Sequence, residues 1–116
     1  MAKKHLPIHY KIEQIMELVQ TLENAFGTMS SVQLAKLDVK QVEAIYQRLN
    51  EMEKDINIAI TRWEIKKIIA ETEDLAFFER RKVRQRLELL KGYREDLKVL
   101  KIRTQRLIKT TKAAKK

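Results

Sequence analysis

The stretch VRQRLELLKGYREDLKVLKIRTQRLI, residues 83–108, decides the fold. Its apolar side chains, with one threonine, recur at intervals of three and four residues, which is the spacing of one face of a long α-helix. The residues with this spacing are Val83, Leu87, Leu90, Tyr93, Leu97, Leu100, Thr104 and Leu107, and Ile108 lies beside the last of them on the same side. We therefore predict a basic helix over residues 75–111 and a frayed tail over residues 112–116. Gly92 lowers the stability of this helix by about 1 kcal/mol relative to alanine. A local bend or a close helix crossing would explain why a glycine is present there.

A second seam of apolar residues lies near the N-terminus. It consists of Ile8, Ile12, Ile15, Val19, Leu22 and Phe26, again at intervals of four and three. Pro7 suits the first turn of a helix, where its missing N–H needs no partner. Gly27 is expected to end the helix, because glycine adopts the left-handed conformation at low cost. These features predict a helix over residues 7–26.

Two capping signals follow this helix. Ser30 and Gln33 have the spacing of a capping box, which predicts a short connector helix within residues 30–38. Asp38 is expected to cap a longer helix over residues 39–72. A third seam runs along that helix through Val39, Val42, Ile45, Tyr46, Leu49, Met52, Ile56, Ala59, Ile60 and Trp63.

The end of this long helix is open to two interpretations, because no glycine or proline marks it. Thr72 and Asp74 are good N-caps, and a break beside them gives two helices of about 35 residues each. Thr61 with Glu64 also fits a capping box and would break the helix earlier. With the first break the predicted fold is all-α: a short N-terminal helix plus a long antiparallel helical hairpin. The three helices form a coiled-coil-like arrangement within a single helical domain over residues 1–116.

The composition argues against several other classes of protein. The 116 residues include two glycines and one proline, too few for the tight turns of an all-β fold. The absence of cysteine excludes disulfides and zinc sites with cysteine ligands. No apolar run approaches the ~18 residues of a membrane span, and the first residues, MAKKHLPIHYKIEQ, lack the apolar core of a signal peptide. We therefore expect a cytoplasmic protein.

The net charge of +9 is concentrated in the last third of the chain. Residues 78–116 contain fifteen Lys or Arg and four Asp or Glu, whereas residues 39–77 carry a small negative excess. On a helix many of these cations lie along one flank of the seam, over roughly 43 Å. Such a flank is expected to contact phosphate groups of nucleic acid without reading sequence. The predicted nucleic-acid-binding residues are Arg80, Arg81, Arg84, Lys91, Lys98, Arg106 and Lys109.

Another interpretation of the chemistry remains open. The cations can instead pair with acids of the preceding helix, as residues beside a coiled-coil seam often do. The protein would then be an adaptor or assembly factor that docks on a partner protein through the apolar hairpin tip. The predicted partner-binding residues are Trp63, Ile69, Leu75, Phe77 and Phe78. The number of apolar residues also predicts a homo-oligomer, because one thin hairpin cannot cover Leu89, Val99 and Ile102 as well as the three seams.

No constellation of residues indicates catalysis. The sequence has no Gly-rich phosphate loop, no thiol and no histidine beside a nucleophile. His5, His9 and Glu13 have a spacing that can suit a metal on one helical face, but Pro7 separates the two histidines. We expect no enzymatic activity, no cofactor and no metal.

Overall fold

The computed structural model describes residues 6–73 and 77–115. Within those residues it contains four α-helices and no β-strand: α1 (Pro7–Thr28), α2 (Ser31–Ala35), α3 (Val39–Thr72) and α4 (Phe77–Ala114). The prediction of an all-α fold is confirmed.

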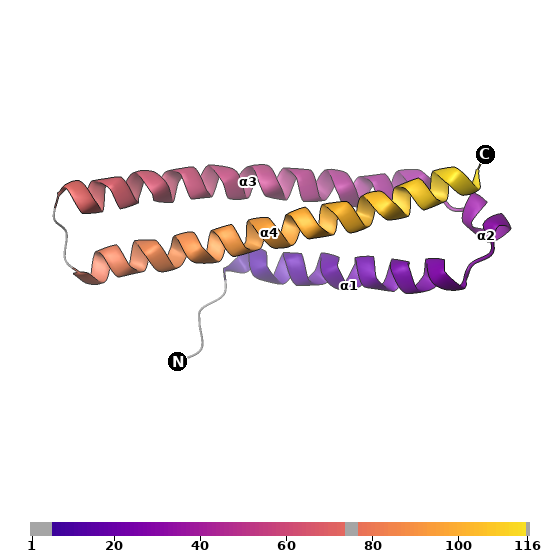
Figure 1. The fold of residues 1–116 in the computed structure, drawn as a ribbon, viewed down its shortest axis with the longest axis horizontal. Coiled ribbons are helices and arrows are strands. Elements are labelled where there is room, and N and C mark those ends of the chain that lie inside the picture. The colour runs from indigo at the N-terminus through magenta and orange to yellow at the C-terminus, as the bar shows by residue number, and fades with distance from the viewer. Residues whose placement is uncertain (1–5, 74–76, 116) are drawn as a thin grey trace.

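The helices α3 and α4 form a long antiparallel hairpin, and α1 lies along one half of it (Figure 1). α1 runs parallel to α4. At its beginning the Leu6 N–H donates to the Tyr93 hydroxyl at 3.4 Å, and further along Glu23 pairs with Arg103. The half of the hairpin that contains the α3–α4 connection extends beyond α1 (Figure 1). The rod, which measures 64 × 28 × 15 Å, therefore has three long helices side by side at one end and two at the other.

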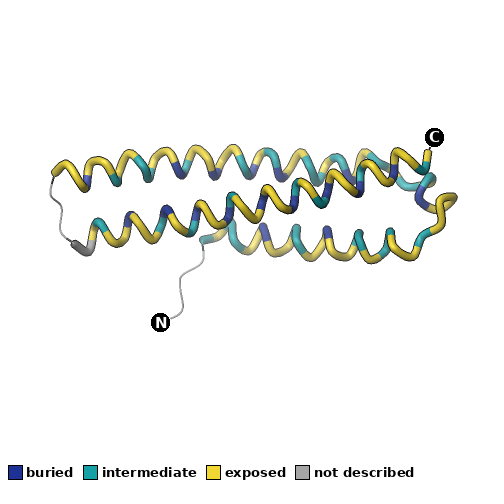
Figure 2. Tube along the Cα trace, viewed as in Figure 1, coloured by how far each residue is buried: buried dark blue, intermediate teal, exposed yellow. Residues whose placement is uncertain are grey.

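The three predicted seams meet in one hydrophobic core. α4 packs against each of the other helices and supplies the largest share of the core. The buried positions face the interior along the whole rod (Figure 2). The apolar core residues are Ile12, Val19, Val42, Leu49, Met52, Ile56, Ile60, Val83, Leu87, Leu90, Tyr93, Leu97, Leu100 and Leu107. Thr104 is buried among them, with its hydroxyl satisfied by the Leu100 carbonyl at 2.8 Å.

The predicted end of α1 is wrong by two residues. The helix continues through Gly27 to Thr28, and Gly27 has no positive φ. Two bonds replace the left-handed glycine: the Thr28 hydroxyl donates to the Ala25 carbonyl, and the Met29 N–H donates to the Phe26 carbonyl. Met29 is extended, which ends the helix.

The predicted caps of the next two helices form. The Gln33 N–H donates to the Ser30 hydroxyl at 3.3 Å, and the Ser30 N–H donates back to the Gln33 side chain at 2.9 Å. This capping box opens α2, which ends at Ala35 and is shorter than the predicted connector helix. The Asp38 carboxylate accepts the Lys40 N–H at 3.0 Å and caps α3.

The hairpin breaks after Thr72, and the alternative break at Thr61 is wrong. α3 continues through Thr61, whose hydroxyl donates to the Asn57 carbonyl instead of capping a new helix. Thr72 ends α3, and Asp74 lies outside the described residues. The close helix crossing suggested for Gly92 is absent, since a Cβ there would meet nothing within 4 Å.

The predicted frayed tail is also wrong for residues 112–114, because α4 continues to Ala114. Thr111 is fully buried, and its hydroxyl donates to the Leu107 carbonyl at 2.9 Å. The Lys112 ammonium pairs with Glu43 of α3 at 3.5 Å. The last turn of α4 is thus held by contacts with the rest of the bundle, where α2 also packs against α4.

Candidate nucleic-acid interface

Several cations of α4 form ion pairs with acids of α3. Lys91 pairs with Glu64 at 3.1 Å and Lys101 pairs with Glu53 at 3.5 Å. The Lys112–Glu43 pair continues the same register, so the three pairs repeat every ten or eleven residues along the antiparallel hairpin. Lys91 was predicted to contact nucleic acid, and its charge is already balanced by Glu64. These pairs link the two helices along one side of the hairpin.

A fourth cation of α4 pairs with α1. Arg103 donates to Glu23 through both Nε and Nη2, with the Nε–Oε2 distance at 3.2 Å. The hydrogen bond from Arg103 lowers the pKa of the Glu23 carboxyl, and the same bond raises the pKa of Arg103. This bidentate pair holds α1 on the side of α4 that faces away from Glu53 and Glu64 of α3.

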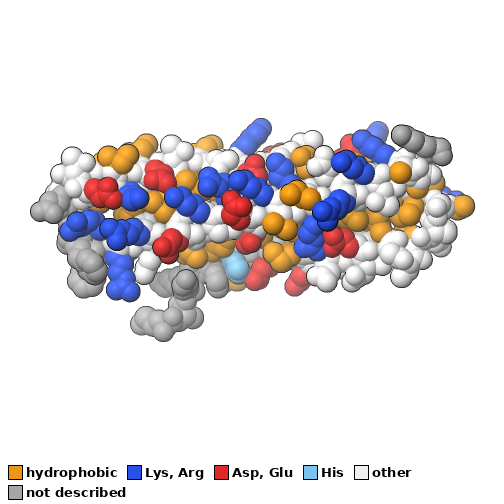
Figure 3. Space-filling model, viewed as in Figure 1, with side chains coloured by type: hydrophobic (Ala, Val, Ile, Leu, Met, Phe, Trp, Pro, Cys, Tyr) orange, Lys and Arg blue, Asp and Glu red, His pale blue; other side chains and the backbone are white. Residues whose placement is uncertain are grey.

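Four of the predicted binding residues are exposed and make no ion pair with any residue that the structure describes: Arg81, Arg84, Arg106 and Lys109. They form two groups, which we call the tip group (Arg81 and Arg84) and the end group (Arg106 and Lys109). Arg80 is half-buried beside the tip group. Acidic and basic side chains alternate along the middle of the molecule (Figure 3). The expected continuous line of free cations is therefore divided in two.

Lys98, the remaining predicted residue, lies between the two groups. Its only partner in the described part of the chain is Glu95 of the same helix, at 3.4 Å, and both side chains are more than half exposed. An exposed pair of this kind contributes little to stability and exchanges readily with solvent ions.

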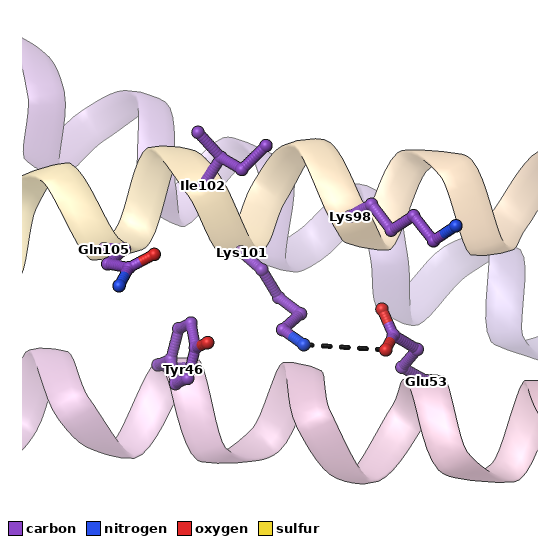
Figure 4. Close-up of a pocket in the computed structure, with 6 residues that line it drawn as sticks. All are labelled: Tyr46, Glu53, Lys98, Lys101, Ile102 and Gln105. Atoms are coloured by element: carbon purple, nitrogen blue, oxygen red, sulfur yellow. Dashed lines mark ion pairs between the residues drawn. The ribbon is translucent and has the colours of Figure 1, made fainter.

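A shallow groove of about 400 Å³ lies between α3 and α4 beside Lys98. It is lined by Tyr46, Glu53, Lys98, Lys101, Ile102 and Gln105 (Figure 4). The Lys101 ammonium points across the groove to Glu53 and lies 5.5 Å from the centre of the Tyr46 ring. Both partners of this pair are about four-fifths buried, so the pair is better shielded than that of Lys98.

Arg94 is a residue of this region that the sequence interpretation did not select. It is half-buried, its Nε is inaccessible to solvent, and it makes no hydrogen bond or ion pair with the described residues. It lies seven residues before Lys101, on the same edge of α4. The sequence contained a signal for it, since Arg94 adjoins the apolar seam, where a charged residue needs a partner.

The predicted partner-binding tip is only partly described. Trp63 is half-buried, with the Lys66 ammonium 4.1 Å and the Arg86 guanidinium 5.4 Å from its ring centre. Ile69 is 44% exposed. Leu75 lies outside the described residues, as do the side chains of Phe77 and Phe78, which begin α4.

Exposed apolar side chains also lie on the outer face of α3, about half a turn from the residues that face α4. We define this outer face by Ile58, Ile65, Ile68 and Ile69, whose exposed fractions range from 44% to 62%. Of the residues proposed to need cover by a second copy, Leu89 packs against the core, whereas Val99 and Ile102 are exposed.

The histidine spacing does not build a metal site in the described residues. His9 pairs with Glu13 at 2.9 Å, and His5 lies outside the described residues. The described part of the chain has no group of three metal-ligating side chains. Among its helices, none combines the length and apolar character needed to cross a bilayer.

Comparisons with protein-family models, with curated proteins and with solved structures found no significant match to this chain.

Proposed function

We propose that this protein is a non-enzymatic nucleic-acid-binding protein, which contacts the phosphate backbone through α4 without reading sequence. The observation that carries the proposal is the presence of four exposed cations, the tip group and the end group, that form no ion pair with a described residue. Cations of this kind bind phosphates by releasing counterions, and the resulting affinity falls steeply with salt.

The spacing of the two groups also favours a double helix. Arg81 and Arg106 are twenty-five residues apart, as are Arg84 and Lys109. At the rise of an α-helix this separation is about 37 Å, close to the ~34–36 Å of one turn of B-DNA. A rod lying along a duplex would therefore meet the backbone of one strand twice, once with each group.

Fluorescence anisotropy with a labelled 20-base-pair duplex at 50 and 200 mM salt tests the proposal. The wild type is expected to bind at low salt and to lose most of its affinity at high salt. Replacing the four cations together (R81Q, R84Q, R106Q and K109Q) should weaken binding strongly and lower the slope of affinity against salt by about one per lost contact.

A matched variant controls for net charge. K11Q, K36Q, K40Q and K54Q remove the same four charges from exposed residues of the other elements that have no ion pair with described residues. Equal weakening by the two variants would contradict a site on α4, and no binding by the wild type at 50 mM salt would contradict the function itself.

The outer face of α3 favours a second candidate function, docking on a protein or on another copy of the chain. Its four exposed isoleucines lie within twelve residues, whereas single exposed apolar residues need no explanation. Sedimentation over a range of protein concentrations tests self-association. If the outer face of α3 binds another copy, the I65Q, I68Q variant should remain monomeric at concentrations where the wild type associates. A wild type that is monomeric at every concentration would contradict self-association, and the candidate docking partner would then be a different protein.

A further inference from the structure

Arg94 lacks the partner that its neighbours on α4 have. Lys91 and Lys101, on either side of it, pair with Glu64 and Glu53 of α3. The register of these two pairs places Arg94 opposite the part of α3 between Glu53 and Glu64. Residues 56–63 of that part, INIAITRW, contain no acid. The other helix of the hairpin therefore offers Arg94 no carboxylate.

The nearest charged neighbours of Arg94 on its own helix are two lysines, which already have carboxylate partners of their own, Glu64 for Lys91 and Glu95 for Lys98. Lys91 lies three residues before it and Lys98 four residues after it, which places both cations next to it on the helix surface. A guanidinium that is partly removed from water and has no partner is energetically unfavourable. A bound anion would remove this cost.

We propose that Arg94 and Lys98 bind one phosphate group of the nucleic-acid backbone, in the middle of α4 between the tip group and the end group. The inference rests on the proposed function and names a phosphate subsite within it. Arg94 supplies the planar donors that match a phosphate. Lys98 supplies a second positive charge by exchanging its exposed partner Glu95 for the phosphate. Lys101 stays on Glu53, since that pair is largely buried.

The test compares R94M with R62M. Both variants remove one positive charge, and methionine keeps much of the stem of arginine. Arg62 is exposed on α3 and has no ion pair with a described residue. We expect R94M to bind the labelled 20-base-pair duplex about tenfold more weakly than R62M at 50 mM salt. The melting temperature of R94M should equal or exceed that of the wild type, because the variant loses an unpaired, partly buried charge.

Equal affinities of R94M and R62M, with a wild type that binds, would overturn the subsite and leave the proposed function intact. A wild type that does not bind would overturn both. Poly-glutamate of matched charge is the second probe. If R94M weakens the binding of poly-glutamate as much as that of the duplex, Arg94 recognises carboxylates in general, and the assignment to phosphate is wrong.

A second measurement on the wild type keeps the proposal testable if R94M does not fold. The Arg94 Nε–H resonance, assigned by its absence from R94K, should shift when the duplex is added to 15N-labelled protein. An unchanged Arg94 resonance, while those of Arg81, Arg84 and Arg106 shift, would place the nucleic acid at the ends of α4 alone and overturn the subsite.

Discussion

Arg103 and Glu23 form the ion pair with the clearest effect on the charge state of a residue. Both are partly buried between α1 and α4, and the two nitrogens of the guanidinium face the two oxygens of the carboxylate. A planar, bidentate pair of this kind is stronger than the exposed lysine pairs of α4. Because α1 touches the rest of the bundle mainly through α4, this pair helps to fix its position, together with the hydrogen bond from the Leu6 N–H to the Tyr93 hydroxyl.

The pair predicts how stability depends on pH. Its hydrogen bond lowers the pKa of Glu23 in the folded state below the ordinary value of 4.5. The stabilisation is therefore fully present above pH 4.5 and is lost as the pH falls through the lower folded value. At pH 7, E23Q should reduce the free energy of unfolding by about 1 kcal/mol, as measured by urea denaturation.

The control for this variant is E17Q, which removes an exposed carboxylate from the same helix without breaking an ion pair to described residues. The difference between E23Q and the wild type should shrink as the pH falls from 4.5 through the lowered folded-state pKa of Glu23, because the carboxyl is then protonated in both states. A difference that does not shrink as the pH is lowered would show that packing, and not the charge, is what the substitution removes.

At the scale of a single helix, Gly92 is a local weakness of α4. It lies exposed in the interior of a 38-residue helix, and an added Cβ would meet no atom within 4 Å. G92A should stabilise the protein by about 1 kcal/mol, since alanine has the higher helix propensity and the unfolded chain loses freedom. Thermal unfolding followed by circular dichroism measures this change. A lower melting temperature would show that Gly92 serves a bend or a contact that the free space around it does not indicate.

The helices themselves could be predicted because their signal is local. The intervals of three and four residues from Val83 to Leu107 identify the buried face of α4, and every apolar residue among them is buried. The ends were predicted less well. Gly27 lies inside α1 because the bonds of Thr28 and Met29 end that helix without a left-handed glycine. Lys112 lies inside α4, where it pairs with Glu43 of a distant helix.

The pairing of the cations could not be predicted, because it depends on the register between helices. The sequence places Lys91 and Lys109 on the same flank of α4, because both lie at about the same angle around the helix axis from the apolar seam. Only the antiparallel register shows that Lys91 meets Glu64, whereas Lys109 meets no acid in the described residues. The same register leaves Arg94 opposite a segment without acids, which no pattern within α4 reveals.

At the scale of the whole molecule, the two-helix end and the three-helix end carry one exposed cationic group each. The tip group lies near the α3–α4 connection, and the end group lies where α1 and α2 surround α4. α4 is a single helix between them, so their separation is fixed to within the bending of one long helix. A rigid separation makes binding sensitive to the length of the ligand.

We therefore expect the affinity for DNA to rise abruptly once a duplex can reach both groups. A duplex of 8 base pairs is about 27 Å long and meets one group at a time, whereas 14 base pairs, about 48 Å, meet both. The longer duplex should show a slope of affinity against salt that is steeper by about 2, one for each added contact. In the R106Q, K109Q variant the two duplexes should have the same slope, because the contacts that are left, the tip group and the Arg94–Lys98 subsite, span about 26 Å and are within reach of either duplex. Equal slopes for the wild type would contradict simultaneous contact and would mean that each group binds alone.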